Sequence, residues 1–248
     1  MEREASFFMI GMLLWKLPGK RERAISLRER SVLHTRFLCA EVARGPRTPE
    51  AILRRRMAAA IRKLRRQNIT RVVLPEGFPY PDLLVKGGIH PVSTLPLRYA
   101  VAADWVRWAL TERGISPPGA RVAVCAPSLT GEVVRTVTEL TLRHRYVTLD
   151  IPYGGEELAR QLRRDYGVSL LLGPSQPEGT EAVVLFEPRS GYQDGVRIPL
   201  YDETASLPPL ALPPALEEQL PAGADRGELL SALREAGAIR PGQVSVGI

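Results

Sequence analysis

Short apolar runs alternate with stretches of helical pattern along the second half of the chain. The run at 121–126 is followed by 131–144, where Val133, Val137 and Leu140 recur at helical spacing. Further short apolar runs lie at 146–149, 168–172, 182–186 and 196–200, and a second helical pattern lies at 155–165. Strands that alternate with helices in this way predict βαβ crossovers and a parallel sheet, with 121–126 as its first and central strand.

The first half of the chain predicts a smaller α/β region. Residues 48–67 predict a helix that begins with Thr48 as its cap and buries one apolar face. A short β-branched strand is expected at 70–74 and a second amphipathic helix at 99–113. At the other end of the chain, the proline-rich stretch 204–224 reads as a connector, and Asp225 with Glu228 predicts a capping box for a last helix at 226–236.

The apolar run Phe7–Trp15 predicts a buried strand or a short core helix. It is much shorter than the roughly 20 residues that a bilayer crossing requires. The preceding residues lack the positive charge of a signal peptide, and no small-residue cleavage site follows. We therefore expect a cytoplasmic protein.

Composition narrows the chemistry without naming a reaction. The chain has 248 residues, of which 44% are hydrophobic and 25% charged, so it can bury a sizeable core. Its two cysteines, Cys39 and Cys125, are too few for a disulfide framework and lie in apolar runs, which predicts buried free thiols. The three histidines are scattered, so no metal site is predicted.

Positive charge is concentrated near the N-terminus. Residues 20–66 hold 15 Lys and Arg against four Asp and Glu, a local net charge of +11 in a chain whose total is +7. One interpretation is a module in which this region binds nucleic acid or an acidic protein partner. The other is an ordinary solvated face, because Arg55, Arg62 and Arg66 fall opposite the apolar face of the expected helix.

The turn after the first strand of the expected sheet carries the clearest binding chemistry. A strand that feeds a helix through a short turn directs free backbone N–H groups and the positive helix end at one point, which attracts phosphate. Here the candidate ligand-binding residues are Ala126, Ser128, Leu129, Thr130 and Gly131, with Gly131 expected to let the helix pack close to the sheet. Asp150 ends the next strand 19 residues later, where a dinucleotide fold places the acid that binds ribose hydroxyls. The alternative is that Asp150 only initiates the turn at 150–155, a role that aspartate often has.

These elements resemble the NAD(P)-binding domain of the shikimate dehydrogenase and glutamyl-tRNA reductase group. The resemblance spans 104–188: a helix leads through Gly114 into the first strand, a short crossover at 173–181 joins the third and fourth strands, and Phe186-Glu187-Pro188 follows the fourth. It implies a Rossmann-like fold and a dinucleotide cofactor. Because a carboxylate at Asp150 would repel a 2′-phosphate, NAD is favoured over NADP.

The chain departs from that group in two respects. Its turn keeps one glycine, Gly131, and Pro127 lacks an N–H, so a domain that retains the fold but binds another ligand or none is an open alternative. The lysine–aspartate catalytic pair of the group has no diagnostic match, since Lys86 and Asp104 are merely the nearest candidates. Catalytic residues and the reaction therefore stay unassigned.

The sequence thus predicts an α/β protein in three parts. Residues 1–115 form the basic α/β N-terminal region, 116–203 the Rossmann-like domain, and 204–248 the connector with the C-terminal helix. Leu210, Leu229, Leu230 and Leu233 are expected to pack this last part onto the body of the protein.

Overall fold

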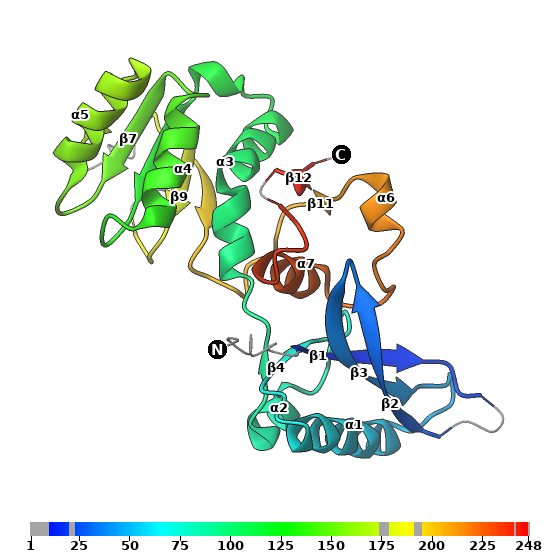
Figure 1. Cartoon of the computed structure of the whole chain (residues 1–248). Helices are drawn as coiled ribbons and strands as arrows, with labels where there is room; N and C mark the ends of the chain where they lie inside the picture. The colour runs from blue at the N-terminus through cyan, green and yellow to red at the C-terminus, as the bar shows by residue number, and fades with distance from the viewer. Residues whose placement is uncertain (1–9, 20–22, 174–178, 191–194, 241, 248) are drawn as a thin grey trace, which may run out of the picture. The chain divides into compact units, whose positions relative to one another are not determined.

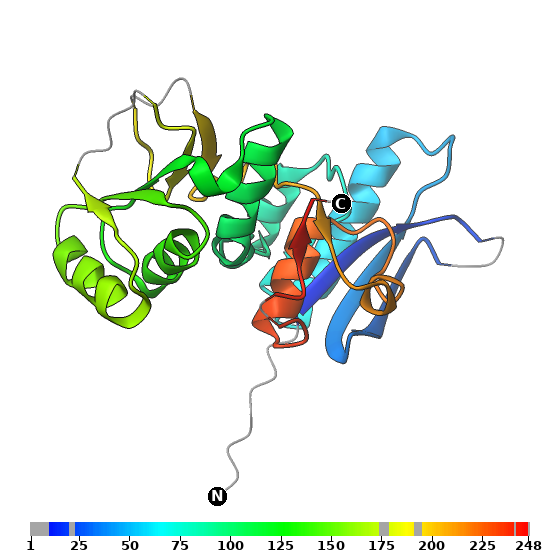
Figure 2. The same ribbon diagram turned by 90° about the horizontal axis from the view of Figure 1, so that it is seen from above.

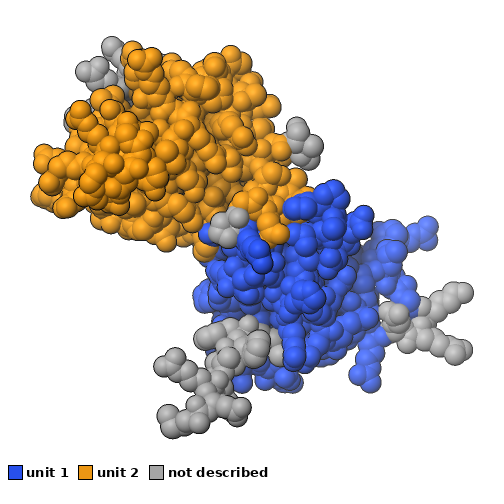
Figure 3. All heavy atoms as spheres, turned by 45° about the horizontal axis from the view of Figure 1, so that its top comes forward, with its two compact units in different colours: residues 1–94, 213–240 blue, residues 95–212, 241–248 orange. Residues whose placement is uncertain are grey.

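The computed structural model describes residues 10–19, 23–173, 179–190, 195–240 and 242–247 (Figure 1). Contacts within the chain group these residues into two compact units, 1–94 with 213–240 and 95–212 with 241–248 (Figure 3). The helix at 95–112 belongs to the second unit by its contacts, whereas the sequence pattern assigned it to the N-terminal region. Its buried residues join the core of the second sheet, which accounts for the grouping.

The first unit is built on a mixed five-stranded sheet. Its strand order is β2-β3-β1-β4-β5, with β2 and β3 antiparallel and the other neighbours parallel. The strands are β1 (Ile10–Lys16), β2 (Ile25–Val32), β3 (Thr35–Ala43), β4 (Arg71–Val73) and β5 (His90–Pro91). The apolar run that ends at Trp15 was predicted to be either a buried strand or a short core helix. Its described part forms a strand, β1. The sheet and its helices confirm the expected α/β class of this region.

Three helices longer than one turn accompany this sheet. They are α1 (Glu50–Arg66), α2 (Pro81–Gly87) and α7 (Arg226–Glu235), and a single turn, α6 (Pro214–Glu217), lies in the proline-rich stretch. The apolar face of α1 is buried as predicted. Its predicted cap is wrong, because the Thr48 hydroxyl accepts a hydrogen bond from the Gly45 N–H at 2.9 Å, and Pro49 occupies the cap position without a side-chain bond.

The C-terminal helix has the predicted Asp225 cap but not the return bond of a capping box, because the Asp225 N–H donates to the Leu74 carbonyl at 2.7 Å. The carboxylate of Asp225 accepts a hydrogen bond from the Glu228 N–H at 2.9 Å. Glu228 in turn accepts from the Leu74 N–H at 2.6 Å, so the cap residues also bind the end of β4. Leu229, Leu230 and Leu233 of α7 are buried in the first unit, whereas Leu210 is buried in the second.

The second unit is a Rossmann-like sheet. All of its neighbouring strands are parallel, and their order is β10-β9-β6-β7-β8. Numbered from β6, this is the order 3-2-1-4-5 of a doubly wound nucleotide-binding sheet. The strands are β6 (Arg121–Cys125), β7 (Tyr146–Asp150), β8 (Leu171–Leu172), β9 (Ala182–Leu185) and β10 (Val196–Pro199). The predicted central position of the first strand is confirmed.

One apolar core joins the helices of this unit to its sheet. Buried residues of α3 (Leu95–Glu112), α4 (Gly131–Thr141) and α5 (Gly155–Tyr166) share a cluster with alternate residues of β6, β7 and β9. Figure 2 shows the ribbon of these helices and strands from above. Residues of the opposite sheet face, Cys125 among them, form a second small cluster beside Tyr201. A 3-10 turn, η1 (Pro117–Gly119), precedes β6, and β11 (Leu210–Ala211) pairs with β12 (Ser245–Val246). Both Cys39 and Cys125 are buried and outside any disulfide, as expected.

Candidate functional site: the carboxyl edge of the parallel sheet

The turn after β6 and the end of β7 lie together at one edge of the sheet. Asp150 pairs with Cys125 in the ladder between the two strands, and its carbonyl accepts a hydrogen bond from the Ala126 N–H at 3.2 Å. On the other side of β6, the Phe186 N–H donates to the Cys125 carbonyl at 2.9 Å. The carboxyl ends of β7, β6 and β9 are thus aligned around the point where the strand order reverses, which is where such sheets bind ligands.

The predicted ligand-binding residues are brought together, but they do not all present the groups expected of them. Ala126 is fully buried, and its N–H is already bonded to Asp150. Ser128 and Thr130 are exposed, and Leu129 and Asp150 are half-buried. The backbone N–H of Thr130 donates to the Ser128 carbonyl at 3.1 Å, which closes the turn.

Thr130 acts first as a helix cap. Its hydroxyl oxygen accepts a hydrogen bond from the Val133 N–H at 3.3 Å, and its backbone is extended at the start of α4. Its role is therefore the N-cap that satisfies one of the free N–H groups of the helix. Ser128 forms no side-chain hydrogen bond with any residue in the described part of the chain, so its hydroxyl remains free for a ligand.

The expected role of Gly131 is wrong. A Cβ placed on Gly131 would meet no atom within 4 Å, so close packing of helix on sheet does not require a glycine there. The glycine that does this is Gly155, at the start of α5, where a Cβ would lie 3.0 Å from Leu172 and 3.2 Å from Ile151. The pair Gly154-Gly155 is the sequence signal for this close approach, and it lies in the turn after β7 instead of the predicted turn after β6.

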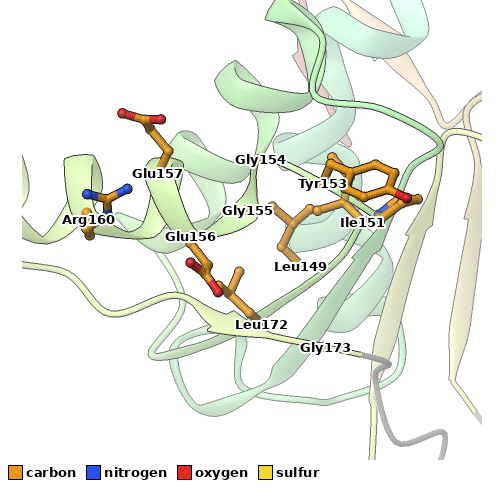
Figure 4. Close-up of a pocket in the computed structure, with 11 residues that line it drawn as sticks. Leu149, Ile151, Tyr153, Gly154, Gly155, Glu156, Glu157, Arg160, Leu172 and Gly173 are labelled. Atoms are coloured by element: carbon orange, nitrogen blue, oxygen red, sulfur yellow. The ribbon is translucent and has the colours of Figure 1, made fainter.

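A cavity of about 430 Å³ opens beside this second turn (Figure 4). It is lined by residues from the end of β7 and the turn after it, from the first half of α5, and from the end of β8 and the residue after it: Leu149, Ile151, Pro152, Tyr153, Gly154, Gly155, Glu156, Glu157, Arg160, Leu172 and Gly173. Gly154 has a φ of +84°, a left-handed conformation that gives the turn its tight bend. None of the predicted ligand-binding residues lines the cavity, although Asp150 lies between Leu149 and Ile151, which do.

The charge around this edge is mainly negative. Glu156 and Glu157 are exposed in the first turn of α5, and in Figure 4 the Glu156 carboxylate lies toward Leu172. Glu132 is exposed in the first turn of α4. Carboxylates at these positions already complement the positive helix ends, so they compete with a bound phosphate. Arg160 is the cation that lines the cavity.

Lys86 and Asp104 are the nearest matches to the lysine–aspartate catalytic pair of the shikimate dehydrogenase group, and each is paired with another residue of its own unit. Lys86 lies 3.5 Å from the carboxylate of Asp82 within the first unit. Asp104 accepts a hydrogen bond from Arg143 at 2.6 Å within the second unit. Across the described ranges, no group of three His, Cys, Asp or Glu side chains is arranged to hold a metal ion.

Several solved structures share a weak likeness with the chain. No protein-family model matches the chain, and no curated protein matches its sequence. Shikimate 5-dehydrogenase from Listeria monocytogenes, solved with shikimate and NAD, is 10% identical over 75% of this chain and 71% of its own, with a TM-score of 0.28. The 5-ketofructose reductase of Gluconobacter sp. strain CHM43 is 12% identical over 73% and 70%, with a TM-score of 0.27. The catalytic subunit of M. jannaschii aspartate transcarbamoylase is 13% identical over 71% and 60%, with a TM-score of 0.29.

Likenesses of this size assign no activity to the chain. The matched proteins include both dehydrogenases and a carbamoyltransferase, and each TM-score is far below the value at which whole folds agree. The Rossmann-like fold of the second unit therefore rests on its own strand order and parallel pairing. The helices that the structure describes include none with the length and apolar content needed to cross a membrane.

Proposed function

We propose that the second unit binds a nucleotide-like small molecule at the carboxyl edge of its sheet, with NAD preferred over NADP. The observation that carries this proposal is the position of Asp150. Asp150 is the last residue of the second strand of a 3-2-1-4-5 sheet, and it lies beside the turn at 126–131. A carboxylate in that position accepts hydrogen bonds from the two hydroxyls of a ribose.

The adjacent cavity suits the base of the same ligand. Leu149, Ile151 and Leu172 supply apolar walls, and its volume of about 430 Å³ lies within the range of small-molecule sites. Tyr153 is 86% exposed at its rim, which leaves its ring available to stack on a base. An adenosine-like nucleoside therefore accounts for both the carboxylate and the neighbouring apolar walls.

The phosphate groups would have to bind at the turn before α4. The N–H groups of Ser128 and Leu129 have no partner among the described residues, and those of Gly131 and Glu132 begin the helix. Pro127 has no N–H, the N–H of Ala126 is bonded to the Asp150 carbonyl, and Glu132 adds a negative charge. This turn supports weaker phosphate binding than a glycine-rich one, so most of the affinity would come from the nucleoside.

The preference for NAD follows from charge. A 2′-phosphate on the ribose would lie close to Asp150 and near Glu156 and Glu157, and like charges at short range repel. Arg145 cannot compensate, because it precedes β7 and so lies at the opposite edge of the sheet.

Direct binding measurements with NAD, NADP, ADP-ribose and ATP test this proposal. We expect NAD and ADP-ribose to bind and NADP to bind at least several-fold more weakly. Asp150→Asn should weaken NAD binding and reduce the difference between the affinities for NAD and NADP. Asp165→Asn is the matched control, because Asp165 lies in the last turn of α5 and pairs with Arg164. Absence of binding by all four ligands, or unchanged NAD affinity in Asp150→Asn, would contradict the ribose assignment.

A second candidate function rests on α1. Its outer face carries five exposed cations that form no ion pair within the part of the chain the structure describes: Arg55, Arg62, Lys63, Arg65 and Arg66. We propose this face as the contact for nucleic acid or an acidic protein partner, if the protein is a binding module. If these side chains contact phosphates, the binding constant for duplex DNA should fall steeply as the salt concentration rises. The slope of the logarithm of the binding constant against the logarithm of the salt concentration should be about −0.9 per contact. Failure to bind nucleic acid at low salt would remove that partner.

A further inference from the structure

β8 forms one edge of the parallel sheet, and its outer side has no neighbouring strand among the described residues. The Gly173 N–H donates to the Leu149 carbonyl of β7 at 3.3 Å. Because alternate residues of a strand direct their backbone groups to opposite sides, the N–H and carbonyl of Leu172 point away from β7. Neither group of Leu172 has a hydrogen-bond partner in the described part of the chain. The edge can therefore accept another strand.

The side chains of this edge are apolar and exposed. Leu171 is 54% exposed and Leu172 is 42% exposed, and successive residues of a strand lie on opposite faces of the sheet. Residues 169–173 carry no charge. The edge strand β2 of the first unit instead exposes three charged residues in a row, at 28–30. Such charges protect a free edge against pairing, so an apolar edge without them is typical of a strand that another chain covers.

The helix beside this edge carries opposite charges at its two ends. Glu156 lies in the first turn of α5, and its carboxylate lies toward Leu172 of β8 (Figure 4). Arg163 follows seven residues later, close to two helical turns, so it lies on the same side of α5 near its other end. Both side chains are exposed, and neither forms an ion pair with a described residue. Between them lies Ala159, whose small side chain permits a close approach of a second helix.

This charge pattern is complementary to a second copy of itself. A two-fold axis perpendicular to the sheet would pair two β8 edges antiparallel and place the two α5 helices side by side in opposite directions. Glu156 of each copy would then face Arg163 of the other, which gives two equivalent ion pairs. A parallel arrangement would bring Glu156 near Glu156 and Arg163 near Arg163, which is unfavourable. The pattern therefore favours the antiparallel pair.

The helix sets the level of the two-fold axis. The axis must pass midway between Glu156 and Arg163, at 159–160, which is about 7 Å along α5 from Gly155 at about 1.5 Å per residue. Gly155 is level with Leu172, because a Cβ on Gly155 would lie 3.0 Å from a side-chain atom of Leu172. Since the helix of a βαβ unit runs opposite to its strands, the axis crosses the sheet edge about 7 Å before Leu172.

The strand is compatible with an axis at that level. A strand advances about 3.3 Å per residue, so the point about 7 Å before Leu172 is Leu170. Antiparallel pairing centred on Leu170 would place Leu172 opposite Val168 of the second copy. These residues are two positions apart in sequence, so their backbone groups point to the same side and can form the ladder. The helix and the strand therefore agree on one register.

We propose that two copies of this chain associate through β8 and α5 and form one continuous sheet across the dimer. The exposed leucines of the two edges are covered, and Glu156 of each copy pairs with Arg163 of the other. The contact is small, so the association is reversible. Glu156 also lines the cavity of the proposed nucleotide site, so each copy supplies a cation to the site of the other. The dimer itself does not require a bound nucleotide.

Sedimentation velocity of the full-length protein over a range of concentrations, without nucleotide, tests the dimer. We expect an equilibrium of monomer and dimer that shifts to dimer as the concentration rises. Leu171→Lys places a charge on the free edge and should weaken association at least about tenfold. Leu142→Lys is the matched control, because Leu142 is equally exposed but lies at the end of α4, and it should associate as the unmodified protein does.

Charge reversal tests which residues pair. Glu156→Arg and Arg163→Glu each bring like charges together in both contacts, so each should weaken association at least about tenfold. The double variant restores opposite charges and should recover most of the affinity. The same exchanges at Glu157 and Arg164 are the matched control. Each of these residues lies one position further along the helix, turned by about 100° away from β8, so their exchange should leave association unchanged.

Three results would overturn the proposal. One is a monomer at every concentration, which would leave the edge to a strand of a different protein. Another is association that Leu171→Lys does not weaken, which would place the interface on another surface. The third is a double variant of Glu156 and Arg163 that associates no better than the single variants. None of these outcomes depends on whether NAD binds, because all are measured without nucleotide.

Discussion

The backbone N–H of Ala126 donates a hydrogen bond to the carbonyl of Asp150 at 3.2 Å. This bond continues the ladder between β6 and β7 beyond the last residue of β6 and holds the turn after β6 beside the end of β7. It brings the two parts of the predicted site together, and it also uses an N–H that a bound phosphate would otherwise engage. For this reason, the ribose contact that we propose at Asp150 would contribute more to ligand binding than the phosphate contact.

The two hydroxyls of the turn should differ in their effect on stability. Thr130→Ala removes the cap that accepts from the Val133 N–H, and we expect it to lower the free energy of unfolding by about 1 kcal/mol. Ser128→Ala removes an exposed hydroxyl and should change stability by less than about 0.5 kcal/mol. Urea denaturation of both variants measures the difference, and equal losses would show that Thr130 is not the cap.

Substitution by alanine should have opposite effects on stability at two glycines of the second unit. A Cβ at Gly195 would lie 2.6 Å from the Thr180 carbonyl oxygen, so Gly195→Ala should destabilise by about 1–3 kcal/mol through overpacking. Gly131→Ala introduces a methyl group into open space in the first turn of α4, and it should be neutral or stabilising by up to about 1 kcal/mol. Thermal unfolding of the pair measures both effects. A strong loss of stability in Gly131→Ala would restore its predicted packing role.

Stability should depend on pH through His144. The unfolded chain binds a proton at His144 with the ordinary pKa of about 6.5, whereas burial lowers the pKa in the folded protein. Below the unfolded pKa the unfolded state holds more protons, so the free energy of unfolding falls as the pH decreases, and the contribution of His144 is complete above that pKa.

Comparison of the protein with His144→Asn isolates this effect. Urea denaturation at pH about 7.5 and about 5.5 should show a smaller pH dependence in the variant, since the residue that titrates has been removed. His34 and His90 are present in both proteins and cancel from the difference. An identical pH dependence of the two proteins would show that His144 does not titrate differently on folding.

The cap of α7 contributes to the first unit through two successive bonds. Asp225→Ala removes the acceptor for the Glu228 N–H, and the loss should be about 0.5–2 kcal/mol. Asp225→Asn retains a side-chain oxygen at the same position and serves as the control, with most of the stability kept. Chemical denaturation followed by circular dichroism gives both values, and equal stability of the two variants would contradict a capping role.

Sequence patterns identified the elements that are defined by local chemistry. The buried face of α1, the strand at Arg121–Cys125 and the cap at Asp225 were predictable, because each depends on residues a few positions apart. The β2–β3 hairpin was missed for a local reason as well. Its turn residues Leu33 and His34 have φ values of +46° and +65°, and neither is a glycine, asparagine or aspartate that would mark such a turn.

The sequence by itself determined the α/β class, the parallel sheet that begins at Arg121, and Asp150 as the carboxylate at the end of its second strand. Only the tertiary structure decided that Gly155, not Gly131, permits close packing of a helix on the sheet, because this depends on the distance between the start of α5 and Leu172 of β8. It also decided the burial of His144 against Pro117, 27 positions away. Side-chain spacing specifies which face of an element is apolar, whereas contacts between elements depend on how their backbones approach one another, and no local pattern encodes that distance.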